Sequence, residues 1–251
     1  MALGKMMVPA SIVLAVVLLV MPLLTALIST PGTRLPTAGV GSVADSPVGA
    51  AAVLNTTAVA GYYCVRAFPS SGWSVMLNAY LPNNTVVQDI MLSVTPIPTL
   101  LTSFYDSNVW SANANPVLLH ARQTIPAFTC GWLVIALEGD EVYIGYSPDG
   151  EHVVWFDRYH AGGNSIIAVS MLLGGVEEGQ ANTGDRTTAF LALYYWSGSS
   201  WAPARLIIAN SGVLESVNHA WVSVSSECGA VVSWPNPTSE VPCPSQPSFK
   251  P

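Results

Sequence analysis

Apolar and polar side chains alternate along much of the chain beyond residue 50. In residues 73–81, Trp, Val, Leu, Ala and Leu alternate with Ser, Met, Asn and Tyr, and a similar alternation covers residues 86–93. The intervening Pro82-Asn83-Asn84 is typical of a turn. Because a period of two places successive side chains on opposite faces of a strand, this pattern predicts a β-hairpin.

Further runs of the same kind predict more strands. Residues 141–147 and 151–157 flank a Pro-Asp-Gly turn, residues 189–196 and 201–209 flank a Ser-Gly-Ser-Ser turn, and residues 218–224 form one more run. No long segment after residue 30 combines helical periodicity with capping residues. Many short strands at close spacing predict an all-β fold, an antiparallel β-sandwich of jelly-roll or concanavalin-like type.

The N-terminal segment is strongly apolar. From Met7 to Ser29 the chain carries no charged residue, and Lys5 precedes this run. About 22 apolar residues exceed the usual core of a signal peptide and suffice to cross a bilayer. We therefore interpret residues 1–29 as a signal peptide or a membrane anchor helix. Either alternative places the rest of the chain outside the cell or on the outer face of the cell membrane.

The remaining chain divides by composition into three parts. Residues 30–50 are rich in Gly, Pro, Ser and Thr and are typical of a linker or an irregular lead. Residues 51–233 contain the alternating runs and constitute the predicted sandwich domain. The proline-rich residues 234–251 are expected to run extended over the surface.

Charge is scarce throughout the chain. Only 9% of the 251 residues are charged, 51% are hydrophobic, and the net charge is −7. Without a basic stretch the chain lacks the footprint of a nucleic-acid-binding protein, and its net charge disfavours anionic lipid. A fold held by apolar packing loses little when carboxylates protonate, which suits an acidic medium. A secreted β protein with a polar but uncharged surface is the alternative explanation.

The cysteines predict disulfides, and the histidines predict no metal site. Four cysteines in an exported chain allow three pairings, among Cys64, Cys130, Cys228 and Cys243. We favour a Cys228–Cys243 pair because these residues flank a proline-rich loop. The histidines lack metal-ligand spacing, so neither a metal nor a cofactor is expected. Asn55 and Asn83 begin glycosylation patterns, which fit export.

Motifs of common nucleophilic and nucleotide-binding enzymes do not occur, but five segments carry a family resemblance. In order they are PTAGVGSVADSPVG, LNTTAVAGYYCV, SVMLNAYLPNNTVVQDIMLSV, FYDSNVWSANANP and LALYYWSGSSWAPARLIIANSGVLESV. Together they resemble the thermopsin family of archaeal acid peptidases over nearly the whole exported part. The chain departs from that family at Met76 and Val86, where glutamine and tryptophan are usual. The resemblance implies an acid endopeptidase acting on extended polypeptides.

The resembling segments supply the candidate site residues. An acid peptidase must activate water where imidazole is protonated, and two carboxyl groups that share a proton can do so. The candidate catalytic residues that these segments contain are Gln88, Asp89, Asp106 and Glu215. Asn78 and Trp110 lie in the same segments and are expected to contact the polypeptide substrate.

Two mechanisms remain open because Gln88 and Asp89 face opposite sides of one strand. If Asp89 faces the substrate, it can form a dyad with another carboxyl group. If Gln88 does, Glu215 can activate water while the amide stabilises the oxyanion, as in glutamic peptidases, which also use a β-sandwich. A non-catalytic binding or adhesion module is the main alternative function. A glycoside hydrolase with two carboxylates is a third.

Overall fold

The computed structural model describes residues 48–111, 118–124, 129–176, 180–182, 187–210, 216–218, 220–224, 229–234 and 243–251. These residues form β-strands and contain no helix, which confirms the predicted all-β class. Among them no helix is long and apolar enough to cross a membrane. The apolar segment 1–29 lies outside the described residues.

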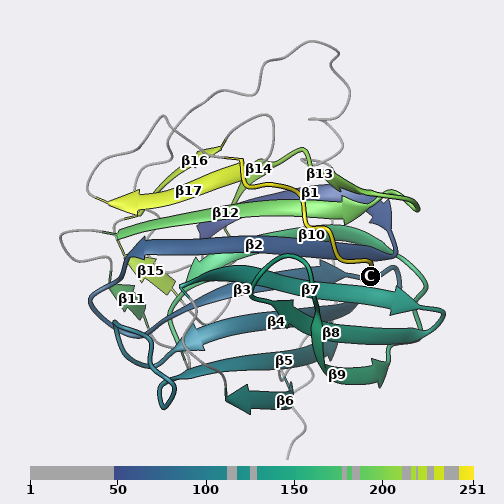
Figure 1. Ribbon diagram of the computed structural model, residues 1–251, viewed down its shortest axis with the longest axis horizontal. Helices are drawn as coiled ribbons and strands as arrows, with labels where there is room; N and C mark the ends of the chain where they lie inside the picture. Colours follow the sequence, from purple (N-terminus) through teal and green to yellow (C-terminus); the bar gives the residue numbers. More distant parts are fainter. Residues whose placement is uncertain are drawn as a thin grey trace, which may run out of the picture. The chain divides into compact units, whose positions relative to one another are not determined.

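The first of two large sheets, which we call sheet I, has seven antiparallel strands (Figure 1). In spatial order they are β14 (Ile207–Asn210), β1 (Val48–Thr56), β10 (Ile166–Gly174), β3 (Trp73–Tyr80), β4 (Thr85–Ser93), β5 (Ser103–Ser111) and β6 (Leu118–Thr124).

Sheet II contains eight antiparallel strands. In spatial order they are β16 (Trp221–Val224), β17 (Gly229–Trp234), β12 (Thr187–Trp196), β2 (Ala58–Ala67), β7 (Cys130–Glu138), β8 (Glu141–Ser147) and β9 (Val154–His160), with β13 (Trp201–Pro203) also paired to β12. A short parallel pair, β11 (Gln180–Asn182) and β15 (Ser216–Asn218), stands apart.

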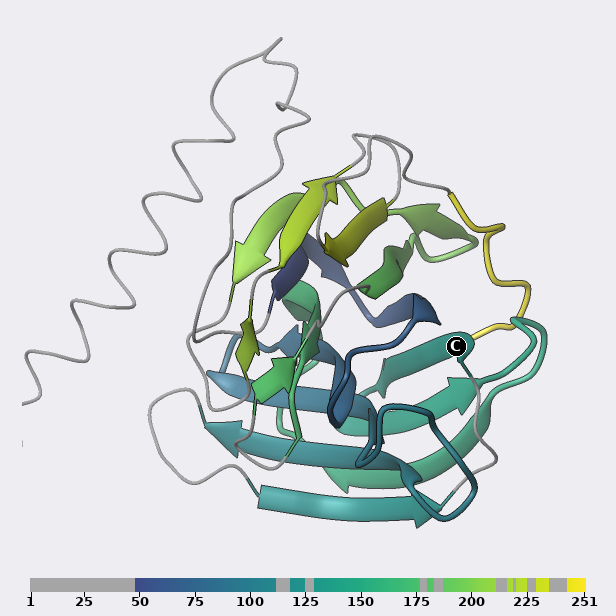
Figure 2. The same ribbon diagram turned by 90° about the vertical axis from the view of Figure 1, so that its left-hand side faces the viewer.

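The two sheets enclose one apolar core, as in a β-sandwich (Figure 2). Leu77 and Met91 contribute to it from sheet I, and Leu133 and Ile144 from sheet II, all without solvent exposure. Alternate residues of β3 and β4 form a second, separate apolar cluster around Met76. Sheet I therefore buries apolar side chains on both of its faces, and the face that carries Met76 is its outer face.

The hairpin expected at residues 73–93 is present. β3 and β4 pair antiparallel, and their turn closes with Asn84 in the left-handed region at φ 64°. Asn83 Oδ1 accepts a hydrogen bond from the backbone N–H of Thr85 at 3.0 Å, which fixes the turn. This side-chain-to-backbone bond is the reason that the Pro-Asn-Asn signal was informative.

Three other predicted strands need correction. The second strand of the Pro-Asp-Gly hairpin is β9, which starts at Val154 and not at residue 151, because Asp149 binds the backbone N–H groups of Glu151 and His152 and keeps them in the turn. The predicted run 201–209 divides between β13 and β14, which lie in different sheets. Run 218–224 likewise divides between β15 and β16.

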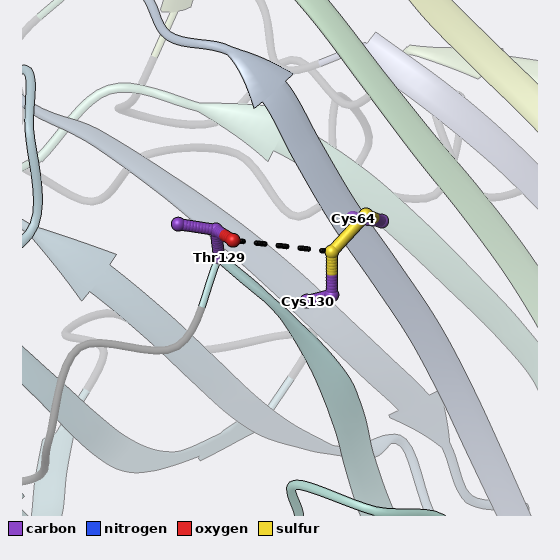
Figure 3. Close-up of a disulfide and its surroundings, with 3 residues drawn as sticks. All are labelled: Cys64, Thr129 and Cys130. Carbon is purple, nitrogen blue, oxygen red and sulfur yellow. Dashed lines mark hydrogen bonds between the residues drawn. A yellow bond between two sulfur atoms is a disulfide. The ribbon is translucent and has the colours of Figure 1, made fainter.

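Covalent and apolar contacts hold the outer side of sheet II. Cys64 and Cys130 lie directly opposite each other on β2 and β7 and form a disulfide (Figure 3). Cys243 is also disulfide-bonded, whereas Cys228, its expected partner, lies outside the described residues. In the tail, Phe249 is buried, and its carbonyl accepts a hydrogen bond from Trp201 Nε1 at 2.7 Å.

Candidate functional site

Four polar side chains form a continuous row across sheet I. Asn108 Nδ2 donates to Gln88 Oε1 at 2.8 Å, and Gln88 Nε2 donates to Asn78 Oδ1 at 2.7 Å. Asn78 Nδ2 then donates to Ser170 Oγ at 3.1 Å. The four residues are direct register partners on β5, β4, β3 and β10. We call this set the amide row.

The amide row lies on the outer face of sheet I. Gln88 alternates along β4 with Val87 and Met91, which point into the core between the sheets. It shares its own face with Ile90, which belongs to the separate cluster around Met76. The alternation of β4 therefore turns the Gln88 side chain away from sheet II.

Each amide of the row keeps hydrogen-bonding capacity beyond the row itself. A primary amide has two N–H donors, and the row uses one from each of its three amides. Such a chain of bonds polarises its members and fixes which way each amide points. Asn78, Gln88 and Ser170 are 4%, 8% and 5% exposed, so these three residues are nearly removed from water, whereas Asn108 is partly exposed.

Asp106 lies on the same face, two residues before Asn108 on β5. Its carboxylate binds Arg122 of β6 through two bonds, Nε to Oδ1 at 2.8 Å and Nη2 to Oδ2 at 2.7 Å. The guanidinium also stacks over the ring of Phe104, with its carbon 5.0 Å from the ring centre. Asp106 is only 3% exposed, so Arg122 balances a charge that is almost completely removed from water.

The remaining predicted residues divide between the two faces. Trp110 lies on β5 opposite Val86 of β4, and the period of two puts it on the outer face with Asn108. Asp89 points the other way, into the core. Glu215 lies outside the described residues. The structure thus brings Asn78, Gln88, Asp106 and Trp110 to one face and separates Asp89 from them.

Asp89 is a fully buried carboxyl group between the sheets. Its Oδ2 accepts a hydrogen bond from the backbone N–H of Val134 on β7 at 3.0 Å, and its Oδ1 has no partner within the described part of the chain. Burial raises the pKa of Asp89 well above its ordinary value of 3.8; the Val134 bond opposes this, and the charges of Asp106 and Asp157 add to it.

Two tyrosines lie close to Asp89. The hydroxyl groups of Tyr63 and Tyr105 share a hydrogen bond of 2.8 Å, and the ring of Tyr105 stacks on that of Tyr146 at 4.1 Å between centres. Burial raises the pKa of both Tyr63 and Tyr105, with Asp89 adding to the effect. All of these groups favour their neutral forms, which is the condition for burying them together.

A second polar group, absent from the sequence-based set, joins the edges of the two sheets. Asp157 of β9 accepts a hydrogen bond from Ser107 of β5 and contacts His120 of β6, with His120 Nδ1 2.7 Å from Oδ2. Ser107 and His120 therefore both bind the carboxylate of Asp157, which lies between them. This differs from a nucleophilic triad, in which the imidazole lies between serine and carboxylate.

The sequence carried only a faint signal for this group. The histidines, His120 among them, were considered only as metal ligands, and Asp157 was only one residue of a predicted strand. A polar residue at an inward position of a strand is the signal that could have revealed Asp157. A register shift between Ile144 and Gly145, where β8 pairs with β9, obscured which positions face inward.

Comparisons with family models and with curated proteins found no match to this chain. Among the described residues, only Asp149, Glu151 and His152 have side chains arranged so that they could hold a metal ion, and all three are exposed. Asp149 already accepts backbone hydrogen bonds of its turn, at 2.8 and 3.0 Å, which explains the arrangement without a metal.

Proposed function

We propose that this protein is an acid endopeptidase resembling thermopsin, with its substrate site on the outer face of sheet I. The observation that carries the proposal is the amide row with Asp106 beside it. Asn78, Gln88 and Asn108 come from three strands within the segments that resemble the family, and hydrogen bonds join them in one register. Functional groups from separate segments that meet on one face are typical of a site.

The amide row supplies the groups that stabilise a tetrahedral intermediate. A carboxylate takes a proton from water, whose oxygen attacks the peptide carbonyl carbon, and the proton then passes to the leaving nitrogen. Gln88 donates an N–H to the oxyanion, and its bond from Asn108 holds the amide in that orientation. Asp106 and Glu215 are the proposed carboxylates, and Arg122 positions Asp106.

Acidic working conditions are part of the proposal. The raised pKa of Asp89 means that the folded chain holds this carboxyl group in its neutral form most readily at low pH. The scarcity of charged residues, 9% of the chain, points the same way because few ion pairs are lost on acidification. Neither feature would stabilise a protein that depends on surface ion pairs at neutral pH.

The type of β-sandwich and the cellular location of the protein are also proposed. We infer a jelly-roll or concanavalin-like sandwich, exported and either released or tethered by residues 1–29. Its polypeptide substrate would lie extended across the strands of sheet I and contact Asn78 and Trp110. No nucleic acid, metal or cofactor takes part.

A binding module without catalysis is the second candidate, and two observations favour it. Asn78, Gln88 and Ser170 are each less than a tenth exposed, so a substrate reaches the row only after the groups covering it move. Both carboxylate oxygens of Asp106 are bound to Arg122, which competes with a water molecule for them.

Digestion of an unfolded protein at about pH 3 by the purified full-length chain tests the proposal. Asp106→Asn and Glu215→Gln are compared with wild type, and Glu141→Gln, which alters a surface ion pair with Arg158, is the matched control. We expect cleavage by wild type and control and its loss in at least one of the other variants. Absence of cleavage by wild type favours the binding module. Full activity in both acid variants would place the chemistry elsewhere.

A further inference from the structure

The loop between β4 and β5 exposes three large aliphatic side chains. Ile97 is 67% exposed, Leu100 57% and Leu101 85%. The loop, residues 94–102, reads VTPIPTLLT and has no charged residue. A single exposed leucine is ordinary, but three such residues on one uncharged loop indicate a surface that contacts something apolar.

Hydrogen bonds within the loop hold this apolar tip in place. The backbone N–H of Val94 donates to the carbonyl of Thr102 at 2.9 Å, and that of Thr99 donates to Thr102 Oγ1 at 3.0 Å. Trp73, buried in the core, donates its indole N–H to the carbonyl of Pro96 at 2.9 Å. Backbone groups bound in this way cost less to remove from water, so the tip is suited to an apolar medium.

The strand register places the start of β1 at the same end of sheet I as this loop. Val48 pairs with Leu173, Leu173 with Val75, and Val75 with Met91, two residues before the end of β4. In Figure 1, β1 begins and β4 ends at the left-hand end of the sheet. The described chain therefore begins, at Val48, at the end of sheet I that carries the apolar loop, and the uncharged run from Met7 to Ser29 precedes it in the sequence.

The opposite end of the sandwich has a different surface. Asn55, at the end of β1, and Asn83, in the turn between β3 and β4, are both exposed and begin the two glycosylation patterns. The turn from β7 to β8, also at this end, carries Glu138, Asp140 and Glu141. Glycans require water, so the end that carries both glycosylation patterns is suited to solvent.

We propose that Ile97, Leu100 and Leu101 insert into the outer surface of a lipid bilayer. This bilayer is the membrane across which, or into which, the apolar N-terminal segment directs the chain. The bilayer is zwitterionic, because the net charge of −7 and the acidic turn at Asp149 and Glu151 disfavour anionic lipid. Insertion orients the sandwich with its glycosylation patterns away from the membrane. The inference depends on the membrane location and not on peptidase activity.

Tryptophan fluorescence of the full-length chain in phosphatidylcholine vesicles tests this inference. Leu101→Trp adds a fluorescent side chain at the loop tip. Ser199→Trp adds a matched one in the exposed turn that follows β12, at the opposite end of the sandwich. With lipids brominated in the acyl chains, we expect the added emission at position 101 to be blue-shifted and quenched several-fold more than that at 199. Leu100→Trp is expected to repeat the result if the first variant folds poorly.

Two outcomes would overturn the inference. Equal quenching at positions 101 and 199 would show that the tip does not enter the bilayer. Concentration-dependent self-association that Leu101→Ser abolishes, together with unquenched emission at 101, would assign the tip to contact with a second copy of the chain. Neither outcome depends on cleavage of a peptide, so failure here is distinguishable from failure of the proposed peptidase activity.

Discussion

The two faces of sheet I bury carboxyl groups in opposite ways. On the outer face, Asp106 is 3% exposed and binds Arg122 through both oxygens. On the inner face, Asp89 has no exposure, one backbone donor and one oxygen without a partner. No lysine, arginine or histidine among the described residues forms an ion pair with Asp89. A cation neutralises the first carboxyl group, whereas the described part of the chain places no cation beside the second.

The outer face therefore carries the groups proposed for catalysis, the amide row and Asp106. The inner face carries Asp89, whose burial makes the stability of the fold depend on pH. The outer face offers fixed amides and a carboxylate that is paired with Arg122. The inner face offers a carboxyl group that is stable when neutral and costly when charged. Successive residues of one strand, Gln88 and Asp89, therefore serve different purposes, and variants of each face test this division.

The largest expected effect on the free energy of unfolding is that of Arg122→Met. Removing the guanidinium leaves the buried Asp106 carboxylate uncompensated, which we expect to destabilise the fold at neutral pH by about 3 kcal/mol. Urea denaturation measures the loss. The double variant Asp106→Asn with Arg122→Met is expected to recover most of it, and a single variant as stable as wild type would refute the role given to Arg122.

An intermediate effect is expected from Asp89→Asn, and its size depends on pH. The folded pKa of Asp89 lies above the unfolded value, so its contribution to stability is complete below pH 3.8 and is lost as pH rises through the folded pKa. The asparagine side chain does not ionise, so the variant does not lose this stability as pH rises. It should match wild type at low pH and exceed its stability at neutral pH. If the free energy of unfolding changed with pH in the same way for both proteins, Asp89 would not be a protonated buried carboxyl group.

Asp149→Asn provides a control of opposite sign. Hydrogen bonds from the backbone of His152 and of Glu151 lower the pKa of Asp149. Its contribution to stability is therefore present above the unfolded pKa and is lost as pH falls through the folded pKa. Urea denaturation of this exposed variant should show a deficit at neutral pH that disappears in acid.

The smallest expected effect is that of Asn108→Ala on the outer face. This change removes the donor to Gln88 Oε1 and leaves that oxygen with one bond fewer in a nearly dry environment. We expect a loss of about 1 kcal/mol in the free energy of unfolding. Serine at the same position retains a donor and should lose less, and an alanine variant with unchanged stability would mean that the row contributes little to the fold.

Much of the strand content was predictable because local signals determine it. The Pro-Asn-Asn turn and the alternation around it gave the β3–β4 hairpin, and the same alternation showed that Gln88 and Asp89 face opposite sides. Errors arose where a distant contact decides the structure. The run 201–209 was predicted as one strand, yet its two ends pair with β12 and β1 in different sheets.

The site was less predictable because its partners are distant in the sequence. Nothing in the β4 pattern shows which face meets sheet II, since both faces carry apolar residues such as Val87 and Ile90. Arg122 is one of six scattered arginines, and only the β5–β6 register reveals that it opposes Asp106. The contact between Asp157 and His120 joins the edges of two sheets, which periodicity cannot anticipate.

Cleavage of an unfolded protein at about pH 3 by Gln88→Met and Asp89→Asn tests the division of the two faces most directly. The two variants alter neighbouring residues of β4, and each replaces a side chain with one of similar volume. Urea denaturation confirms that both are folded. The account predicts that Gln88→Met lowers kcat by roughly 100-fold, because a donor to the oxyanion is lost, while Asp89→Asn keeps wild-type activity. An inactive Asp89→Asn beside an active Gln88→Met would contradict it and place the chemistry between the sheets.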